Sequence, residues 1–134
     1  MTEAEIKKAS KHSVPNAEEF TRVLGQVTWL MTQSSKHKLY DLTYIEAHVV
    51  APLMFKQVRV FTKAKQPIAA LIWAYASPEL QRKVQQKDYV LNIQDWRSGE
   101  EVVVVDCISP FVDGEMFISQ FMDDVEIAKA NKAK

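Results

Sequence analysis

The chain has 134 residues, of which 47% are hydrophobic and 25% charged, and its 17 basic side chains balance 17 acidic ones. This composition excludes a disordered, collagen-like or low-complexity protein, because such chains lack the apolar side chains that build a core. The single cysteine, Cys107, excludes a disulfide framework or a CxxC motif and suits a reducing compartment. No apolar run is long enough for a membrane helix, so we expect one soluble, cytoplasmic domain.

The N-terminal part predicts a lead-in followed by a helix. Residues 1–15 are polar and predict a flexible segment, so the single folded domain is expected over 16–134. Asn16, with a glutamate three residues later, has the pattern of a capping box, and apolar residues then recur at helical spacing over 17–33. Gly25 lies inside this helix and costs about 1 kcal/mol relative to alanine, so we expect close packing there.

The rest of the chain alternates between helical and extended patterns. A second amphipathic helix is expected over 41–56, where Pro52 should kink or split it because proline lacks the N–H group. Strands at 58–62 and 68–76 predict an antiparallel hairpin. The remaining elements are a short helix, an irregular segment, a strand and a last helix, expected over 78–87, 88–100, 101–109 and 114–130. This order predicts an α+β domain with helices packed on a mostly antiparallel sheet.

The zero net charge conceals a basic window. Between Lys36 and Lys65 there are six basic residues and two acidic ones. Such a window can attract an acidic partner, although a mixed solvated surface is the simpler interpretation. Nucleic acid is not favoured as that partner, because no tight basic run with interleaved aromatic residues occurs.

Asp106 is the most unusual residue of the strand expected over 101–109. An ionised carboxylate among valines needs a partner or a shifted pKa. Strict alternation places Asp106 on one face with Val102, Val104 and Ile108. The alternative is a strand-end aspartate that caps a turn or reaches solvent.

The histidines are the other candidates for chemistry. His37 lies in a polar loop between Lys36 and Lys38, whose charges favour a neutral imidazole that can act as a base or a nucleophile. Taken alone, a loop histidine is ordinarily a surface residue. His48 is expected to pack inside the second helix, and His12 belongs to the lead-in. The three lack a metal-ligand spacing, so no metal site is expected.

Four segments occur in a distinctive order along the chain. They are VLGQVTWLMTQSSKH (23–37), LIWAYASPEL (71–80), QDWRSGE (94–100) and VVVVDCISPFVDG (102–114). Together they resemble the toxin-activating lysine acyltransferases, the activators of RTX protoxins such as hemolysin. The segments follow the family's order and spacing, so the resemblance covers about residues 23–114.

The resemblance implies a GNAT-like fold and transfer of a fatty acyl group from acyl-acyl carrier protein to internal lysines of an RTX protoxin in the cytoplasm. Carried over by position, the catalytic pair falls on His37 and Asp106, with Ser34 and Gly99 as supporting residues. It implies no metal or organic cofactor, since the carrier delivers the acyl chain. The basic window then becomes the expected carrier-docking surface, formed by Lys36, Lys38, Lys56 and Arg59.

Two departures from the family pattern bear on these expectations. Cys107 stands where hemolysin-type members often carry an aromatic residue, which alters the expected acyl pocket. The chain ends at Lys134, soon after the matched region, so the sheet is expected to be shorter or completed by a second copy in a homodimer.

Several alternatives stay open at this point. One is a non-catalytic module that binds an acyl carrier or a peptide in the same fold. Another is a GNAT-like enzyme that uses acyl-CoA, which the absence of a glycine-rich phosphate loop disfavours. Within the acyltransferase, His37 is either the base or a transient acyl acceptor. In both cases we expect His37 and Asp106 to lie within hydrogen-bond reach.

Overall fold

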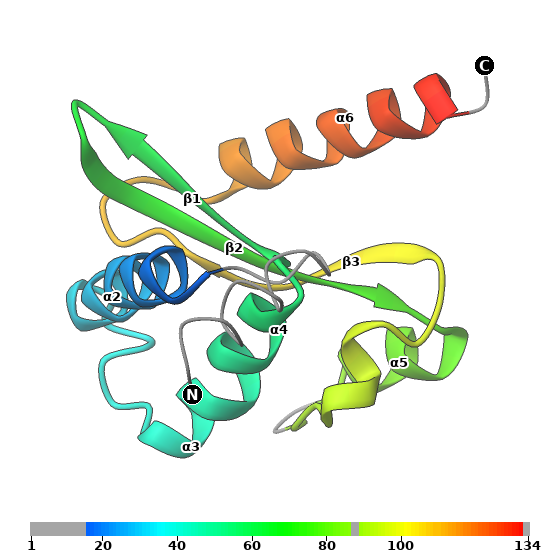
Figure 1. The fold of residues 1–134 in the computed structure, drawn as a ribbon, viewed down its shortest axis with the longest axis horizontal. Coiled ribbons are helices and arrows are strands. Elements are labelled where there is room, and N and C mark those ends of the chain that lie inside the picture. The colour runs from blue at the N-terminus through cyan, green and yellow to red at the C-terminus, as the bar shows by residue number, and fades with distance from the viewer. Residues whose placement is uncertain (1–15, 87–88, 133–134) are drawn as a thin grey trace.

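A three-stranded antiparallel sheet forms the centre of the fold, in the order β1–β2–β3 (Figure 1). β1 (Val58–Lys63) and β2 (Gln66–Ala76) form the predicted hairpin, and β3 (Glu101–Ile108) pairs with the other side of β2. The α+β class is as predicted and is consistent with a GNAT-like fold. The computed structural model describes residues 16–86 and 89–132, so the predicted lead-in lies outside the described residues.

Helices cover both faces of this sheet (Figure 1). On one face lie α2 (Ala17–Gln33) and a helical segment made of α3 (Leu42–Ile45), the π-helix η1 (Glu46–Val50) and α4 (Ala51–Met54). The other face carries α6 (Glu115–Lys132). No helix in the described ranges is both long and apolar enough to cross a membrane.

Each face of the sheet has its own hydrophobic cluster. The α2 side includes Leu30, Val49 and Ile72, and the α6 side includes Leu71 and Phe121. The connection from β2 to β3 contains α5 and the 3₁₀ helix η2, which span Pro78–Lys83 and Ile93–Trp96.

α2 begins where the capping pattern predicts. The Asn16 side chain accepts a hydrogen bond from the Glu19 N–H at 2.7 Å, which satisfies one of the free donors of the first turn. Val27 and Leu30 are fully buried on the inner side. Gly25, in contrast, is exposed, and a Cβ added there would meet nothing within 4 Å. The predicted close packing at Gly25 is therefore wrong, because the residue lies on the solvent side of the helix.

The second predicted helix is split, as expected from its proline, but the interruption precedes Pro52. The Ala51 N–H donates to the carbonyl oxygen of Glu46, five residues back, which makes a π turn. Pro52 then lies in the first turn of α4, directly after this π turn, which accommodates the missing N–H. The wider turn therefore lets the helical segment continue past the proline.

β3 contains a bulge that changes which way Asp106 faces. Ile72 of β2 pairs with Asp106, but the next residue, Trp73, pairs with Val104, so Val105 is an extra residue. Strict alternation predicted Asp106 on the same face as Val104. Instead, Val104 packs on the α6 side, whereas Asp106 lies with Ile72 and Val105 on the α2 side. The prediction is wrong because the extra residue reverses the alternation.

Candidate active site

The turn that follows α2 carries His37 into the protein interior. The N–H groups of His37 and Lys38 both donate to the carbonyl oxygen of Ser34, at 3.1 and 2.9 Å. The Tyr40 ring packs edge-on against the imidazole, with ring centroids 5.3 Å apart. His37 is only 2% exposed, so the ordinary reading of a solvent-facing loop histidine does not apply.

Both ring nitrogens of His37 have buried partners. Nε2 lies 2.9 Å from Oδ2 and 3.1 Å from Oδ1 of Asp106, which confirms that the two residues meet across 69 positions of sequence. Nδ1 lies 2.6 Å from the Ser34 Oγ. The structure thus places a hydroxyl, an imidazole and a carboxylate in one hydrogen-bonded row. This is the arrangement found in nucleophile–base–acid triads on unrelated folds.

Asp106 is the hub of this group. Its buried carboxylate also accepts a hydrogen bond from the Tyr44 hydroxyl, and the Lys36 Nζ lies 3.9 Å from its Oδ1. Burial alone would raise the pKa of Asp106, but the hydrogen bonds and charges of His37, Tyr44 and Lys36 outweigh it and hold the pKa below its ordinary value. The carboxylate is therefore ionised at neutral pH.

Tyr44 is the site residue that the sequence analysis missed. Burial and the neighbouring Asp106 carboxylate raise the pKa of Tyr44 far above its ordinary value, so the phenol keeps its proton and acts as a donor. It comes from α3, which begins at an Asp41 cap whose side chain accepts the Tyr44 N–H at 3.1 Å. That capping pattern marks a helix start, but no sequence signal shows that this tyrosine reaches a carboxylate on β3.

The charge on Asp106 fixes the tautomer of His37. An ionised carboxylate can only accept, so Nε2 carries the hydrogen and donates it to Asp106. In the neutral ring, Nδ1 then has the free lone pair, which can accept the hydrogen of the Ser34 hydroxyl. The nitrogen that can act as a base is consequently Nδ1, and Ser34 is its hydrogen-bond partner.

Two cavities border this group. One, of about 270 Å³, is largely aromatic and is lined by Lys36, Tyr40, Tyr44, His48, Tyr89, Val105 and Asp106. The other, of about 300 Å³, lies on the Ser34 side and is lined by Ser34, Lys36, His37, Cys107, Ser109, Asp113, Gly114, Glu115 and Ile118. The catalytic candidates therefore lie between an aromatic space and a polar one, and Lys36 borders both.

His48 and Cys107 are packed residues near the site. His48 is buried, as predicted, and its Nε2 accepts the Leu91 N–H at 3.2 Å, while burial lowers its pKa and keeps the ring neutral. Burial, with the nearby charges of Asp106 and Glu115, raises the pKa of the Cys107 thiol to about 11. A thiol in that state is a poor nucleophile at neutral pH. Cys107 packs on the α6 side of the sheet as a small hydrophobe.

The structure does not bring Gly99 to this group. Its N–H donates to the Tyr75 carbonyl oxygen at 3.0 Å, and a Cβ there would clash with the carbonyl group of Ala76. Ala76 is four residues along β2 from Ile72, the partner of Asp106, which is about 13 Å of strand. Gly99 therefore serves close backbone approach at the end of β2.

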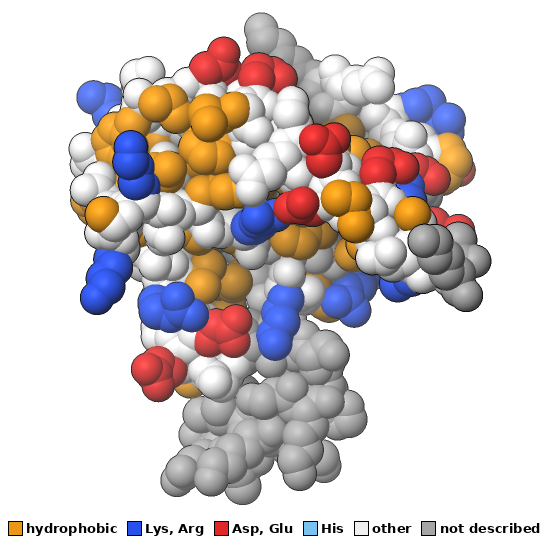
Figure 2. Space-filling view, turned by 90° about the horizontal axis from the view of Figure 1, so that it is seen from above, with side chains coloured by type: hydrophobic (Ala, Val, Ile, Leu, Met, Phe, Trp, Pro, Cys, Tyr) orange, Lys and Arg blue, Asp and Glu red, His pale blue; other side chains and the backbone are white. Residues whose placement is uncertain are grey.

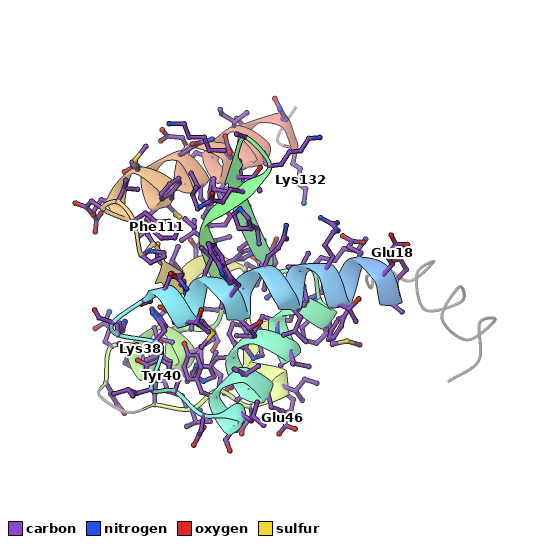
Figure 3. The ribbon with its side chains drawn as sticks, turned by 90° about the vertical axis from the view of Figure 1, so that its left-hand side faces the viewer. Glu18, Lys38, Tyr40, Glu46, Phe111 and Lys132 are labelled. Atoms are coloured by element: carbon purple, nitrogen blue, oxygen red, sulfur yellow. The ribbon has the colours of Figure 1, made fainter. Side chains whose placement is uncertain are left out.

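The four predicted docking residues are not gathered on one surface. Lys36 and Lys38 belong to the turn beside His37, and Figure 3 shows Lys38 near Tyr40 where the chain leaves α2. Arg59, on the opposite edge strand, binds Asp124 of α6 at 2.8 Å, and Lys56 follows α4. The α6 side carries basic and acidic side chains intermixed (Figure 2). Lys36 and Lys38 therefore lie beside the site, apart from Arg59, and carrier docking stays a prediction.

The chain is similar to a known protein family and to individual known proteins. A model of the RTX toxin acyltransferase family matches residues 16–133. The chain is 28% identical over 94 residues to the RTX-II toxin-activating lysine-acyltransferase ApxIIC of Actinobacillus pleuropneumoniae, which covers 70% of this chain and 59% of that protein. It is 30% identical over 91 residues to the protein-lysine myristoyltransferase HlyC of Escherichia coli, covering 68% and 54%.

Another relative matches over a greater length. The uncharacterized protein sll0720 of Synechocystis is 23% identical over 119 residues, covering 87% of this chain and 81% of that protein. The chain spans just over half the length of the two named acyltransferases. Since the family model covers nearly all of the chain, this protein belongs to the RTX toxin acyltransferase family.

Proposed function

We propose that the protein transfers a fatty acyl group from the thioester of an acyl carrier protein to internal lysines of an RTX protoxin. The observation that carries the proposal is the buried hydrogen-bonded row of Ser34, His37 and Asp106 in a chain of this family. The names of two relatives, a toxin-activating lysine-acyltransferase and a protein-lysine myristoyltransferase, support lysine as the acceptor and a fatty acyl group as the cargo.

The reaction needs a base, because an ammonium group cannot attack a thioester until it loses a proton. In the proposed step, the acceptor amine passes its proton to His37 Nδ1 through the Ser34 hydroxyl. The amine attacks the thioester carbonyl, a C–N bond forms, the C–S bond breaks and the thiol leaves. Asp106 holds the ring in the Nε2–H tautomer and stabilises the imidazolium that forms.

The same geometry bears on the choice between base and acyl acceptor. The Ser34 Oγ lies 2.6 Å from Nδ1 and occupies its lone pair, while Nε2 is committed to Asp106. An acyl-imidazole would require one of these partners to move away. The arrangement therefore supports His37 as the base, with Ser34 as the group that relays the proton.

The surroundings of the site suit its two substrates. The aromatic cavity on the Asp106 side offers rings against which the acyl thioester can pack. Lys36 and Lys38, beside the site, supply positive charge toward an acidic carrier protein. Because interactions between exposed charges weaken as the Debye length falls from about 10 Å at 0.1 M salt to about 3 Å at 1 M, carrier binding should weaken with salt.

The test compares acyl transfer by the wild type and by His37→Ala. Purified protein is incubated with myristoyl-carrier protein and a co-encoded RTX protoxin, and acylation of the protoxin is read by intact mass. Loss of the base should lower the rate at least ~10²-fold. Carrier binding by the variant is measured separately, and circular dichroism checks its fold.

The outcomes separate the competing functions. Equal rates for the folded variant and the wild type would contradict the proposal. Carrier binding without any acylation by the wild type would support a non-catalytic binding module instead. Acylation from myristoyl-CoA but not from the carrier protein would support an acyl-CoA-dependent enzyme.

A further inference from the structure

A lysine of the protein itself stands where the proposed reaction needs an acceptor amine. The Lys36 Nζ lies 3.9 Å from Oδ1 of Asp106, whose carboxylate also holds His37. The Lys36 side chain is 69% exposed, so its amine is accessible to a bound substrate. We propose that Lys36 is a self-acylation site, which receives the acyl group of a thioester bound in the aromatic cavity. This inference rests on the proposed function.

The position of Lys36 makes it the best-placed amine. Among the described lysines, Lys36 alone lines the two cavities that border the His37–Asp106 pair. Its backbone is held within a turn in which the N–H groups of His37 and Lys38 bind the Ser34 carbonyl oxygen. An amine tethered beside the reacting carbonyl needs no bimolecular encounter, and such tethering accelerates reactions strongly.

Other described lysines lie elsewhere or are engaged elsewhere. Lys83 binds Asp95 at 3.0 Å, and Lys129 approaches two glutamates at 3.7 Å. Lys38 lies only two positions from Lys36 and is exposed, but it lines neither of the two cavities. Lys38 is therefore the natural internal comparison, since it has the same chemistry and similar access to solvent without the contact to Asp106.

The step balances without any further reagent. The Lys36 ammonium gives up a proton through Ser34 to His37 Nδ1, and the free amine attacks the thioester carbonyl carbon. A C–N bond forms, the C–S bond breaks and the leaving thiolate takes up the second proton of the amine. The product is an Nε-acyl-lysine, so the Lys36 side chain loses its positive charge, and the proton on His37 then passes to solvent.

The experiment incubates the full chain with myristoyl-carrier protein or myristoyl-CoA, with and without the RTX protoxin. Intact mass gives the number of acyl groups, and peptide mapping locates them. We expect acylation of Lys36 to exceed that of Lys38 at least ~10-fold, and Asp106→Asn to lower it by about 10²-fold. In Lys36→Arg, which retains the positive charge, this acyl group should be absent from the intact mass.

Each other result overturns the inference. Equal acylation of Lys36 and Lys38 in the wild type would show uncatalysed chemistry, and this comparison requires no variant to fold. Unchanged acylation of Lys36 in folded Asp106→Asn would show the same. Acylated protoxin with unmodified Lys36 would remove the self-acylation site but leave the proposed function intact. Absence of both products would remove both.

Discussion

Replacing Asp106 by asparagine tests the site most directly, because it changes charge with little change in shape. The carboxylate accepts hydrogen bonds from His37 Nε2 and from the Tyr44 hydroxyl. An asparagine side chain offers one acceptor oxygen and an NH₂ group that can only donate. With the NH₂ group opposite Nε2, the ring must carry its hydrogen on Nδ1. The nitrogen facing Ser34 then cannot accept a proton.

The contacts of Asp106 indicate the size of the expected changes in kcat and in the free energy of unfolding. Loss of the basic nitrogen should lower kcat by about 10²- to 10⁴-fold, the range for removal of a general base or of the correct tautomer. Hydrogen bonds to a charged group contribute about 1.5–3 kcal/mol each, and the neutral amide of asparagine weakens or removes the bonds that His37 Nε2 and the Tyr44 hydroxyl make to Oδ2. We therefore expect Asp106→Asn to lower the free energy of unfolding by about 1.5–3 kcal/mol at pH 7.

The pH dependence of the free energy of unfolding tests separately whether the Asp106 charge stabilises the fold. The pKa of Asp106 is below its ordinary value in the folded protein, so its charge stabilises the fold above the unfolded pKa of about 4. That contribution disappears as the pH falls through the folded pKa. The difference in unfolding free energy between wild type and Asp106→Asn should therefore be largest near neutral pH and shrink below about pH 4.

The assay is urea unfolding at several pH values, together with acyl transfer at pH 7. Asp124→Asn is the matched control, because Asp124 is half-exposed and its bond to Arg59 is a surface pair worth about 0–1 kcal/mol. The control should turn over normally. Normal turnover by folded Asp106→Asn, or a stability difference that is the same at pH 3 and pH 7, would refute the reasoning.

Four further predictions concern individual residues. In Tyr44→Phe, the Asp106 carboxylate loses a hydrogen-bond donor, so its negative charge stabilises the imidazolium more strongly. The acid limb of the pH–rate profile should therefore move to higher pH, and activity should fall about 10-fold. An unmoved limb would show that Tyr44 is a packing residue. Gly99→Ala should lower the free energy of unfolding by about 1–3 kcal/mol, because the added Cβ clashes with the backbone of Ala76. Gly25→Ala should raise it by up to about 1 kcal/mol, because alanine favours the helix and its Cβ meets no neighbour. Urea unfolding measures both changes. Iodoacetamide should label Cys107 slowly at pH 8 and rapidly after denaturation, because the folded thiol has a pKa of about 11; rapid labelling of the native protein would contradict this.

The elements with strong local signals were predictable from the sequence. α2 spans the predicted residues 17–33 because its Asn16 cap and its apolar spacing act within a few residues. The second strand was predicted to begin at Ile68 but begins at Gln66, since Pro67 suggests a loop. Pro67 pairs with Thr62 of β1 next to a register shift, and β3 pairs with β2 only from Ala70 onward, so the proline lies at an irregular end of the sheet, where proline is tolerated.

The contact between His37 and Asp106 was predictable from the sequence, but other parts of the site were not. The family resemblance gave His37, Asp106 and Ser34, and the structure places the three together. The burial of His37 could not be predicted, because it depends on tertiary packing against Tyr40 and against Asp106 of β3. The face of Asp106 was predicted wrongly, since an extra residue at Val105 has no signature among four successive valines. Tyr44 was missed because its partner, Asp106, is 62 residues away in the sequence.

The long separation of these residues in the chain links activity to the cooperativity of folding. His37 follows α2, Tyr44 belongs to α3, and Asp106 belongs to β3, which is paired on one side only among the described strands. Any local opening that detaches β3 from β2 removes the carboxylate while leaving the helices in place. Edge elements open at lower free energy than the core. The fraction of molecules with β3 attached therefore sets an upper limit on the active fraction, and slowed amide exchange in β3 should accompany any ligand that binds at the site.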